Sequence, residues 1–206
     1  QCFQYRNKCR DKADYLDQML KLPKNFFEHF SIISNDYPLS PEDIHNAGIR
    51  YSGVHIGQND CDVISARKIL NTWDNPEKMI LGLSTHNMDE LTAAHTCPLH
   101  TLSYIACGPY SDTITKYNTA PVLGRERAAR LFFKSTLPVV MIGGITLEII
   151  NDIRKHLVSF GCKNLELNPD FVTEKIRKDL FFALISGLCN MEIGIRNFQS
   201  FLQFSQ

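Results

Sequence analysis

Short apolar runs alternate with segments of helical spacing along the chain, and this alternation constrains the fold more than any other feature. The runs lie near residues 2–5, 30–34, 52–56, 79–83, 102–107, 137–142 and 180–186. Nearly continuous apolar runs are typical of strands that are buried on both faces of a parallel sheet. Strand followed by helix, repeated this often, predicts an α/β fold. The runs favour closure into a parallel (β/α)8 TIM barrel over the alternative, an open doubly wound sheet.

Two of the intervening segments show the helical pattern clearly. Apolar residues fall on one side over 60–70, and they form a stripe over 146–160 that ends before Gly161. The stretch 161–179 is longer than the roughly 2–6 residues of an ordinary connection. We interpret it as an insertion that contains a short helix over 171–178.

We predict a single domain over residues 1–206, because no repeat, linker or low-complexity segment divides the chain. With 44% apolar residues, it is long enough to bury one core. The first predicted strand begins at residue 2, and Gln1 is not an initiator Met. We therefore expect the first strand and helix of the barrel to be missing from this sequence.

Composition argues against several classes of partner. Lys plus Arg and Asp plus Glu number 22 each, and no apolar stretch approaches the roughly 20 residues that span a bilayer. We expect no nucleic-acid or membrane partner, while a homo-oligomer remains open. The seven cysteines show no Cys-x-x-Cys spacing, which favours free thiols in the cytoplasm over a disulfide framework or a zinc site.

Polar motifs follow six of the apolar runs at the point where each ends. They are Gln4–Lys8, Asn35-Asp36, Gly57–Asp60, Ser84–Asn87, Gly108–Lys116 and Ile142–Thr146. A barrel gathers the carboxyl ends of its strands at one face, so we expect these motifs to form one site.

The first motif indicates an anion site. Arg6 and Lys8 point the same way as Gln4 if the strand continues, and inward cations need an anion such as a diphosphate. A solvated strand end is the alternative.

Asp36 and Asp60 are the metal candidates, since two carboxylates with water and phosphate oxygens commonly hold Mg²⁺. A turn and a helix cap are their alternative roles.

Later motifs add hydroxyls, a lysine and glycines. Lys116 follows Thr113 and Thr115 on a predicted loop. The two hydroxyls and the ammonium group could bind an anion together, or the segment is an ordinary surface loop. Gly144 lets a phosphate approach the backbone, and Ser186 ends the last strand, where barrels often bind phosphate. His55 lies within a strand and is expected to be a core or supporting residue, and His86 either contacts substrate or is structural. No Cys-His or Ser-His-Asp arrangement is apparent.

In this order, the motifs resemble those of thiamine-phosphate synthase. The matching residues are Gln4/Arg6/Lys8, Asn35-Asp36, Gly53 to Asp60, Ser84/His86, Gly108 to Lys116, Ile142 to Ile145 and Ile185-Ser186. The resemblance covers about residues 2–190. It implies a transferase of thiamine biosynthesis that joins hydroxymethylpyrimidine diphosphate to hydroxyethylthiazole phosphate. The implied reaction is dissociative and assisted by Mg²⁺: diphosphate leaves first, and the thiazole nitrogen captures the pyrimidine cation.

The resemblance also implies a role for each matched residue. Catalytic roles are implied for Arg6, Lys8, Lys116 and Ser84, and Mg²⁺ binding for Asp36 and Asp60. The pyrimidine is expected to bind Gln4, Asn35 and Ser84, and the diphosphate Arg6, Lys8 and Lys116. The thiazole phosphate is expected to bind Thr113, Thr115, Gly144 and Ser186, and Ile185 is also implied to bind substrate. No general base is implied, because the nucleophilic nitrogen carries no proton.

One departure and two alternatives accompany this reading. Ser111-Asp112 stands where the family usually has an aromatic-proline pair, and the added charge is expected to weaken phosphate binding there. A thiazole tautomerase is one alternative, although Pro109 occupies the place of its histidine. The other is a non-catalytic barrel that binds a thiamine-related phosphate.

Overall fold

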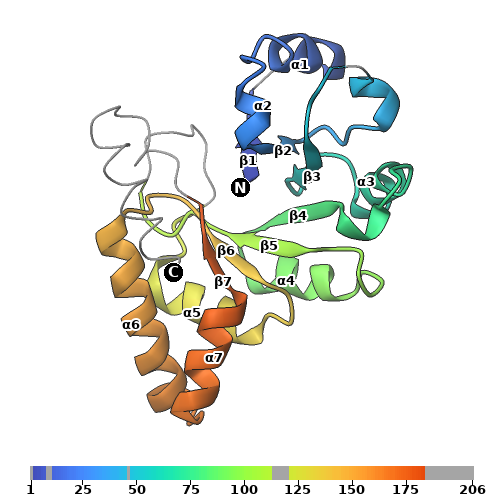
Figure 1. Cartoon of the computed structure of the whole chain (residues 1–206). Coiled ribbons are helices and arrows are strands. Elements are labelled where there is room, and N and C mark those ends of the chain that lie inside the picture. The colour runs from blue at the N-terminus through green and yellow to red at the C-terminus, as the bar shows by residue number, and fades with distance from the viewer. Residues whose placement is uncertain (1, 8–10, 46, 113–120, 184–206) are drawn as a thin grey trace. The chain divides into compact units, whose positions relative to one another are not determined.

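The computed structural model describes residues 2–7, 11–45, 47–112 and 121–183 (Figure 1). The chain divides into two compact units. The first comprises residues 1–84 and 97–104, and the second comprises residues 85–96 and 105–206. Parallel strands and helices make up both units.

The first unit contains a parallel sheet with strands in chain order. The strands are β1 (Cys2–Tyr5), β2 (Ser31–Asn35), β3 (Tyr51–Ile56) and β4 (Ile80–Thr85). The helices are α1 (Lys12–Met19), α2 (Phe26–His29) and α3 (Val63–Leu70), with 3₁₀ turns over Pro41–Ile44 and Pro76–Lys78.

The second unit repeats the arrangement with three strands that also pair in parallel. They are β5 (Tyr104–Cys107), β6 (Val139–Met141) and β7 (Leu180–Phe182). Tyr104, the first residue of β5, still belongs to the first unit. The helices are α4 (Met88–His95), α5 (Gly124–Lys134), α6 (Leu147–Asn164) and α7 (Pro169–Asp179).

All seven predicted strands occur in the described part of the chain, and their parallel pairing confirms the α/β prediction. The last strand ends at Phe182, short of the predicted 186, and residues from 184 onward lie outside the described ones. Closure into an eight-stranded barrel stays a prediction.

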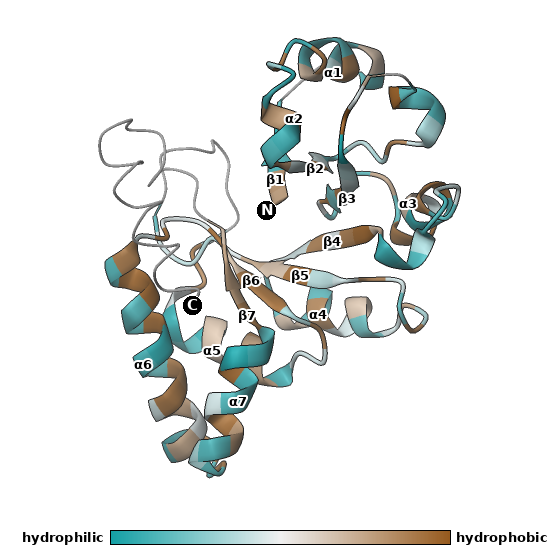
Figure 2. Ribbon diagram, viewed as in Figure 1, coloured by the Kyte–Doolittle hydropathy of each residue, from teal (hydrophilic) through white to brown (hydrophobic). Residues whose placement is uncertain are grey.

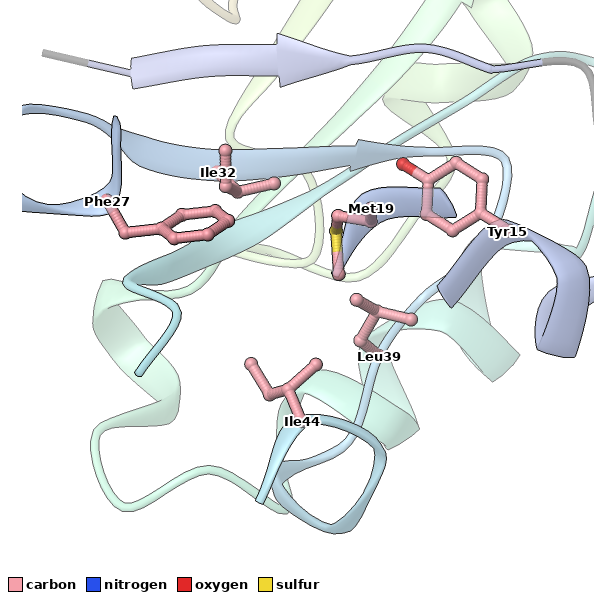
Figure 3. Close-up of a cluster of buried hydrophobic side chains, with 6 residues drawn as sticks. All are labelled: Tyr15, Met19, Phe27, Ile32, Leu39 and Ile44. Carbon is pink, nitrogen blue, oxygen red and sulfur yellow. The ribbon is translucent and has the colours of Figure 1, made fainter. Parts of the chain in front are cut away.

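An apolar core in the first unit packs helices against β2 (Figure 3). It consists of Tyr15, Met19, Phe27, Ile32, Leu39 and Ile44, all buried. Full burial of such a side chain contributes about 1.5–3 kcal/mol to folding. The Tyr15 hydroxyl donates to the Tyr5 carbonyl at 2.6 Å and accepts from the Asn35 backbone N–H at 3.0 Å. The core thereby also fixes the ends of β1 and β2.

A bulge in β3 decides which of its side chains face the core. Ile32 pairs with Tyr51 and Ile33 with Gly53, so Ser52 is an extra residue in β3. Because side chains alternate along a strand, one extra residue switches the faces. Tyr51 packs against the core beside Trp73, with ring centroids 5.1 Å apart. Gly53 and the residues in phase with it take the opposite face.

Helix α3 begins later than predicted. Asp62 is its cap and accepts from the Ser65 N–H at 3.0 Å, so the prediction that the helix begins at Asp60 is wrong. The apolar face is also narrower than predicted, because Ile64 is 55% exposed while Ala66 is buried. An aspartate two residues closer to the apolar pattern competes successfully for the cap.

Helix α6 extends through Gly161, so the prediction that it ends before this glycine is wrong. A Cβ at Gly161 would lie 2.7 Å from Phe133 Cζ and 2.8 Å from Val172 Cγ2. The glycine therefore permits close packing on α5 and α7 and does not end the helix. Helix α7 confirms the short helix predicted over 171–178.

Apolar and polar patches alternate along α6 (Figure 2). The buried stripe of α6 includes Ile150, Ile153, Leu157 and Phe160. Within the described ranges, no helix combines the length and apolar character that a membrane crossing requires.

Gly53→Ala tests the bulge. Gly53 has a φ of +146°, and a Cβ there would lie 1.9 Å from the Ile80 carbonyl oxygen of β4. We expect the clash and backbone strain to lower the free energy of unfolding by about 3 kcal/mol. Urea denaturation measures it. Gly48→Ala is the control: Gly48 has a φ of +68° but open space around its missing Cβ, so about 1 kcal/mol is expected. Equal losses would contradict this role of Gly53.

Candidate functional site

Polar side chains collect on one face of the sheet in the first unit, near the carboxyl ends of its strands. Asn35 is the register partner of His55, and His55 is the partner of Gly82. Gln4 belongs to the same face, since its Nε2 donates to Asn35 Oδ1 at 2.6 Å. Ser84 lies two residues beyond Gly82 and shares its side of β4. Four strands thus contribute to one polar surface, whereas the expectation that all six motifs form one site stays a prediction.

The Asn35 amide has a fixed orientation. Its oxygen accepts from Gln4, and its Nδ2 donates to Asp36 Oδ1. Asn35 is only 6% exposed and its partners Gln4 and Asp36 are half-buried, so these hydrogen bonds are partly shielded from water. The amide presents its remaining N–H as a donor, which suits recognition of an acceptor on a ligand.

Asp36 ends β2 in a left-handed conformation with a φ of +70°. Non-glycine residues rarely adopt this conformation, and it often occurs at functional sites. The backbone N–H of Asp36 donates to the His55 carbonyl at 2.9 Å, which fixes the turn to β3. The carboxylate is therefore held beside Asn35 by both its backbone and its neighbour.

Asp60 belongs to a tight loop after β3. Its Oδ2 accepts from the Gly57 N–H at 2.6 Å, and Gln58 Nε2 donates to the Ser84 carbonyl at 2.5 Å. The first hydrogen bond closes the loop on itself, and the second fixes the loop to the end of β4. The exposed carboxylate is a ligand candidate and is not the cap of α3, which is Asp62.

The two aspartates fit one way of holding Mg²⁺. They follow neighbouring strands, and proteins often bind this ion through one or two carboxylates with water and substrate phosphates completing the octahedron. The described residues contain no group of three or more His, Cys, Asp or Glu side chains that would hold a metal without such help. A metal here would therefore depend on oxygens from a phosphorylated ligand.

A buried hydrogen-bonded chain supports Ser84. His55 Nε2 lies 3.0 Å from Ser84 Oγ, and His55 Nδ1 lies 3.0 Å from the Tyr104 hydroxyl. His55 is 5% exposed, in agreement with the core or supporting role that its strand position indicated. Tyr104 was missed, because an aromatic residue next to an apolar run resembles ordinary core. Gly82 was the sequence signal that could have indicated Tyr104, because a glycine within a strand often marks a place where another group approaches closely.

His86 lies in the second unit and is bound to the start of α4. Its Nδ1 is 2.9 Å from Glu90 Oε2, and its backbone N–H donates to the same oxygen at 2.7 Å. Asn87 caps α4 by accepting from the Glu90 N–H at 2.9 Å. These contacts favour the structural alternative for His86.

Gly144, also in the second unit, is covered by the unusual Ser111-Asp112 pair. A Cβ at Gly144 would lie 2.1 Å from Ser111 Oγ and 2.7 Å from the Asp112 carbonyl oxygen. Ser111 Oγ donates to the Gly144 carbonyl at 3.2 Å. The space left by this glycine is therefore filled by the chain itself, and phosphate binding at Gly144 stays a prediction.

The structure brings together Gln4, Asn35 and Asp36 directly, and it ties the Asp60 loop to Ser84. Arg6 follows β1 with an exposed side chain. The remaining predicted residues, Lys8, Thr113, Thr115, Lys116, Ile185 and Ser186, lie outside the described residues.

Known proteins resemble this chain in sequence and in fold. The profile of the family described as thiamine monophosphate synthase matches residues 1–162. The thiamine-phosphate synthase of Koribacter versatilis is 34% identical over 145 residues, which cover 70% of this chain and 63% of that protein. The enzyme of the same name from Limosilactobacillus reuteri is 30% identical over 159 residues, covering 73% and 67%.

A solved structure, thiamine phosphate pyrophosphorylase from Pyrococcus furiosus, matches with a TM-score of 0.61 and 19% identity. The match covers 95% of this chain and 78% of that one, and it shows a common fold. Sequence matches to other relatives are shorter: that to the thiamine-phosphate synthase of Streptococcus agalactiae is 39% identical and spans 49% of this chain and 42% of the relative. The chain thus spans about two fifths to two thirds of the length of these curated relatives. With most of its sequence matched by the family profile, the chain belongs to the thiamine monophosphate synthase family.

Proposed function

We propose that the protein is a thiamine-phosphate synthase, which joins hydroxymethylpyrimidine diphosphate to hydroxyethylthiazole phosphate and releases diphosphate. The observation that carries the proposal is the polar face of the first unit. Gln4, Asn35 and Ser84 lie on this face. The Asp36 carboxylate accepts from the Asn35 amide, and the loop that carries Asp60 is hydrogen-bonded to the Ser84 carbonyl. Family membership supplies the reaction that such a face fits.

The proposed chemistry uses these side chains as donors and charges. The amides of Gln4 and Asn35, with the Ser84 hydroxyl, bind the pyrimidine substrate. Arg6, Lys8 and Lys116 bind the diphosphate and stabilise its charge as the carbon–oxygen bond breaks. The pyrimidine methyl cation is then captured by the thiazole nitrogen, which carries no proton, so no general base takes part.

The thiazole phosphate is assigned to residues of later motifs. They are Thr113, Thr115, Gly144, Ile185 and Ser186. Binding both substrates together turns the second step into a reaction between neighbours, which lowers its entropic barrier. It also leaves less room for water, which would otherwise capture the cation.

Mg²⁺ is the proposed cofactor, held by Asp36 and Asp60. When bound, the ion would neutralise charge on the leaving diphosphate. The Gly57 N–H and the Asn35 amide orient the two carboxylates for this role.

A second candidate is a protein that binds the pyrimidine phosphate without turnover. It is favoured by the Ser111 contact with Gly144, which fills the space that the thiazole phosphate was expected to approach. A thiazole tautomerase is disfavoured, because Pro109 stands where that enzyme has its histidine.

The deciding experiment incubates the purified protein with both phosphorylated substrates, with and without Mg²⁺. We expect diphosphate and thiamine phosphate to appear in equal amounts and only with the metal. Calorimetric binding of the pyrimidine diphosphate with no product would favour the second candidate and rule out the synthase.

Arg6→Ala tests the diphosphate site. Loss of a hydrogen bond to a charged group should reduce kcat/KM for the pyrimidine diphosphate roughly ten- to hundredfold. Arg6 is exposed, so the melting temperature should change little. Arg177→Ala is the control, since Arg177 is also exposed and pairs with Glu174 on α7. A fall in both variants, or in neither, would contradict the assignment.

Asp60→Asn tests the metal site. The substitution keeps an oxygen for the Gly57 N–H but removes the negative charge. The Mg²⁺ concentration for half-maximal activity should rise roughly tenfold or more. Asp62→Asn is the matched control, because asparagine also caps helices well and the Asp62 carboxylate accepts from the Ser65 N–H at the start of α3. An unchanged Mg²⁺ requirement in Asp60→Asn would remove Asp60 from the site.

A further inference from the structure

Three buried or half-buried side chains of the first unit are linked by hydrogen bonds, and the proposed reaction uses only one of them, Ser84. The Tyr104 hydroxyl, the His55 imidazole and the Ser84 hydroxyl are linked by two contacts of 3.0 Å each. The His55 and Tyr104 rings also stack, with centroids 5.6 Å apart and planes 20° apart. Stacking and hydrogen bonding together hold the imidazole in one orientation.

The fold makes specific room for the phenol. A Cβ at Gly82 would lie 2.1 Å from Tyr104 Cζ and 2.4 Å from its hydroxyl oxygen. Gly82 is also the register partner of His55. A larger residue at position 82 would therefore displace the Tyr104 hydroxyl from the imidazole. The glycine is required by this contact and not by a turn.

The hydrogen-bond directions follow from the phenol. Burial raises the pKa of Tyr104, so its hydroxyl keeps its proton, and this proton needs an acceptor. The acceptor within reach among the described residues is His55 Nδ1. A neutral imidazole that accepts at Nδ1 carries its proton on Nε2, which donates to Ser84 Oγ. This tautomer is assigned from the hydrogen-bond network.

The assignment has a consequence at the site. With Ser84 Oγ accepting from His55, the serine proton is left to donate elsewhere. Ser84 is half-buried and lies on the polar face that carries Asn35. An acceptor on a bound ligand completes the chain, whereas a donor at that place would meet another donor.

We propose that Tyr104 and His55 are positioning residues that hold the Ser84 hydroxyl as a hydrogen-bond donor to an acceptor atom of the pyrimidine diphosphate. The inference rests on the proposed function for the identity of the ligand. It adds that Tyr104 affects the substrate only indirectly, through its hydrogen bond to His55 and the hydrogen bond from His55 to Ser84.

Tyr104→Phe is the central test, because it removes the hydroxyl and keeps the stacked ring. The imidazole then loses the donor that selects its tautomer, and Ser84 loses its fixed direction. We expect kcat/KM for the pyrimidine diphosphate to fall roughly tenfold, with no change in KM for the thiazole phosphate. Ser84→Ala should cause a comparable or larger loss.

A double-mutant cycle separates positioning from general stability. In a Ser84→Ala background, Tyr104→Phe should change kcat/KM less than about twofold, because the group it acts through is gone. Additive losses in the double variant would overturn the proposal. The dissociation constant of the pyrimidine diphosphate, measured by calorimetry on the same four proteins, provides a second reading of the same coupling.

Two further variants complete the design. His55→Gln retains an N–H donor near Ser84 and should recover much of the activity that His55→Leu loses. Tyr51→Phe removes a different buried hydroxyl, one bound to Ser34 on the core side of the sheet, and should lower the melting temperature without changing kcat/KM. Equal activity of His55→Gln and His55→Leu would contradict the donor role.

Failure of the two proposals can be distinguished. If the unmodified protein binds the pyrimidine diphosphate but forms no product, the synthase proposal fails, and the cycle in binding constants still decides the positioning role. Coupling in that cycle supports the role, and additivity overturns it. If the protein binds no pyrimidine diphosphate, both proposals are wrong.

Discussion

The extra residue at Ser52 determines which side of β3 carries its chemistry. Without the bulge, strict alternation would place His55 on the same face as Tyr51, among the core side chains. Because of the shift, β3 contributes to both faces: Tyr51 packs on the core, and His55 contacts Ser84 on the polar face. Gly53 makes this possible, because its φ of +146° and its close approach to Ile80 exclude a side chain.

A second constraint holds the neighbouring strand ends in place. The Tyr15 hydroxyl binds the Tyr5 carbonyl and the Asn35 N–H, so one core residue of α1 fixes two strand ends at once. Burial raises the pKa of Tyr15, which keeps the hydroxyl protonated and able to donate. Packing of the core is thereby coupled to the position of the Asn35 amide. Substitutions in the core are expected to reach the site through this hydroxyl before they unfold the sheet.

The sequence was sufficient for the strands and for much of the polar face, and insufficient for the contacts that orient it. Apolar runs locate buried strands because burial on both faces leaves a simple pattern. Asp60 and Asp62 could not be separated as helix caps, since both precede the same apolar stripe and only the backbone shows which one accepts from Ser65. The role of Tyr104 was hidden for a related reason. Its ring belongs to the core by composition, and its hydroxyl matters only because Gly82 lies beneath it.

Two serines, on the strands that flank β3, show why residue type alone does not identify a functional group. Ser34 is fully buried, and its Oγ lies 2.7 Å from the Tyr37 carbonyl and 2.9 Å from the Tyr51 hydroxyl. Its capacity to donate and to accept is therefore used within the core. Ser84 Oγ accepts from His55, and its half-buried hydroxyl still has a proton to donate. The difference is the Ser84 proton, which the hydrogen bond from His55 does not use and which a ligand with acceptor atoms can bind on the polar face.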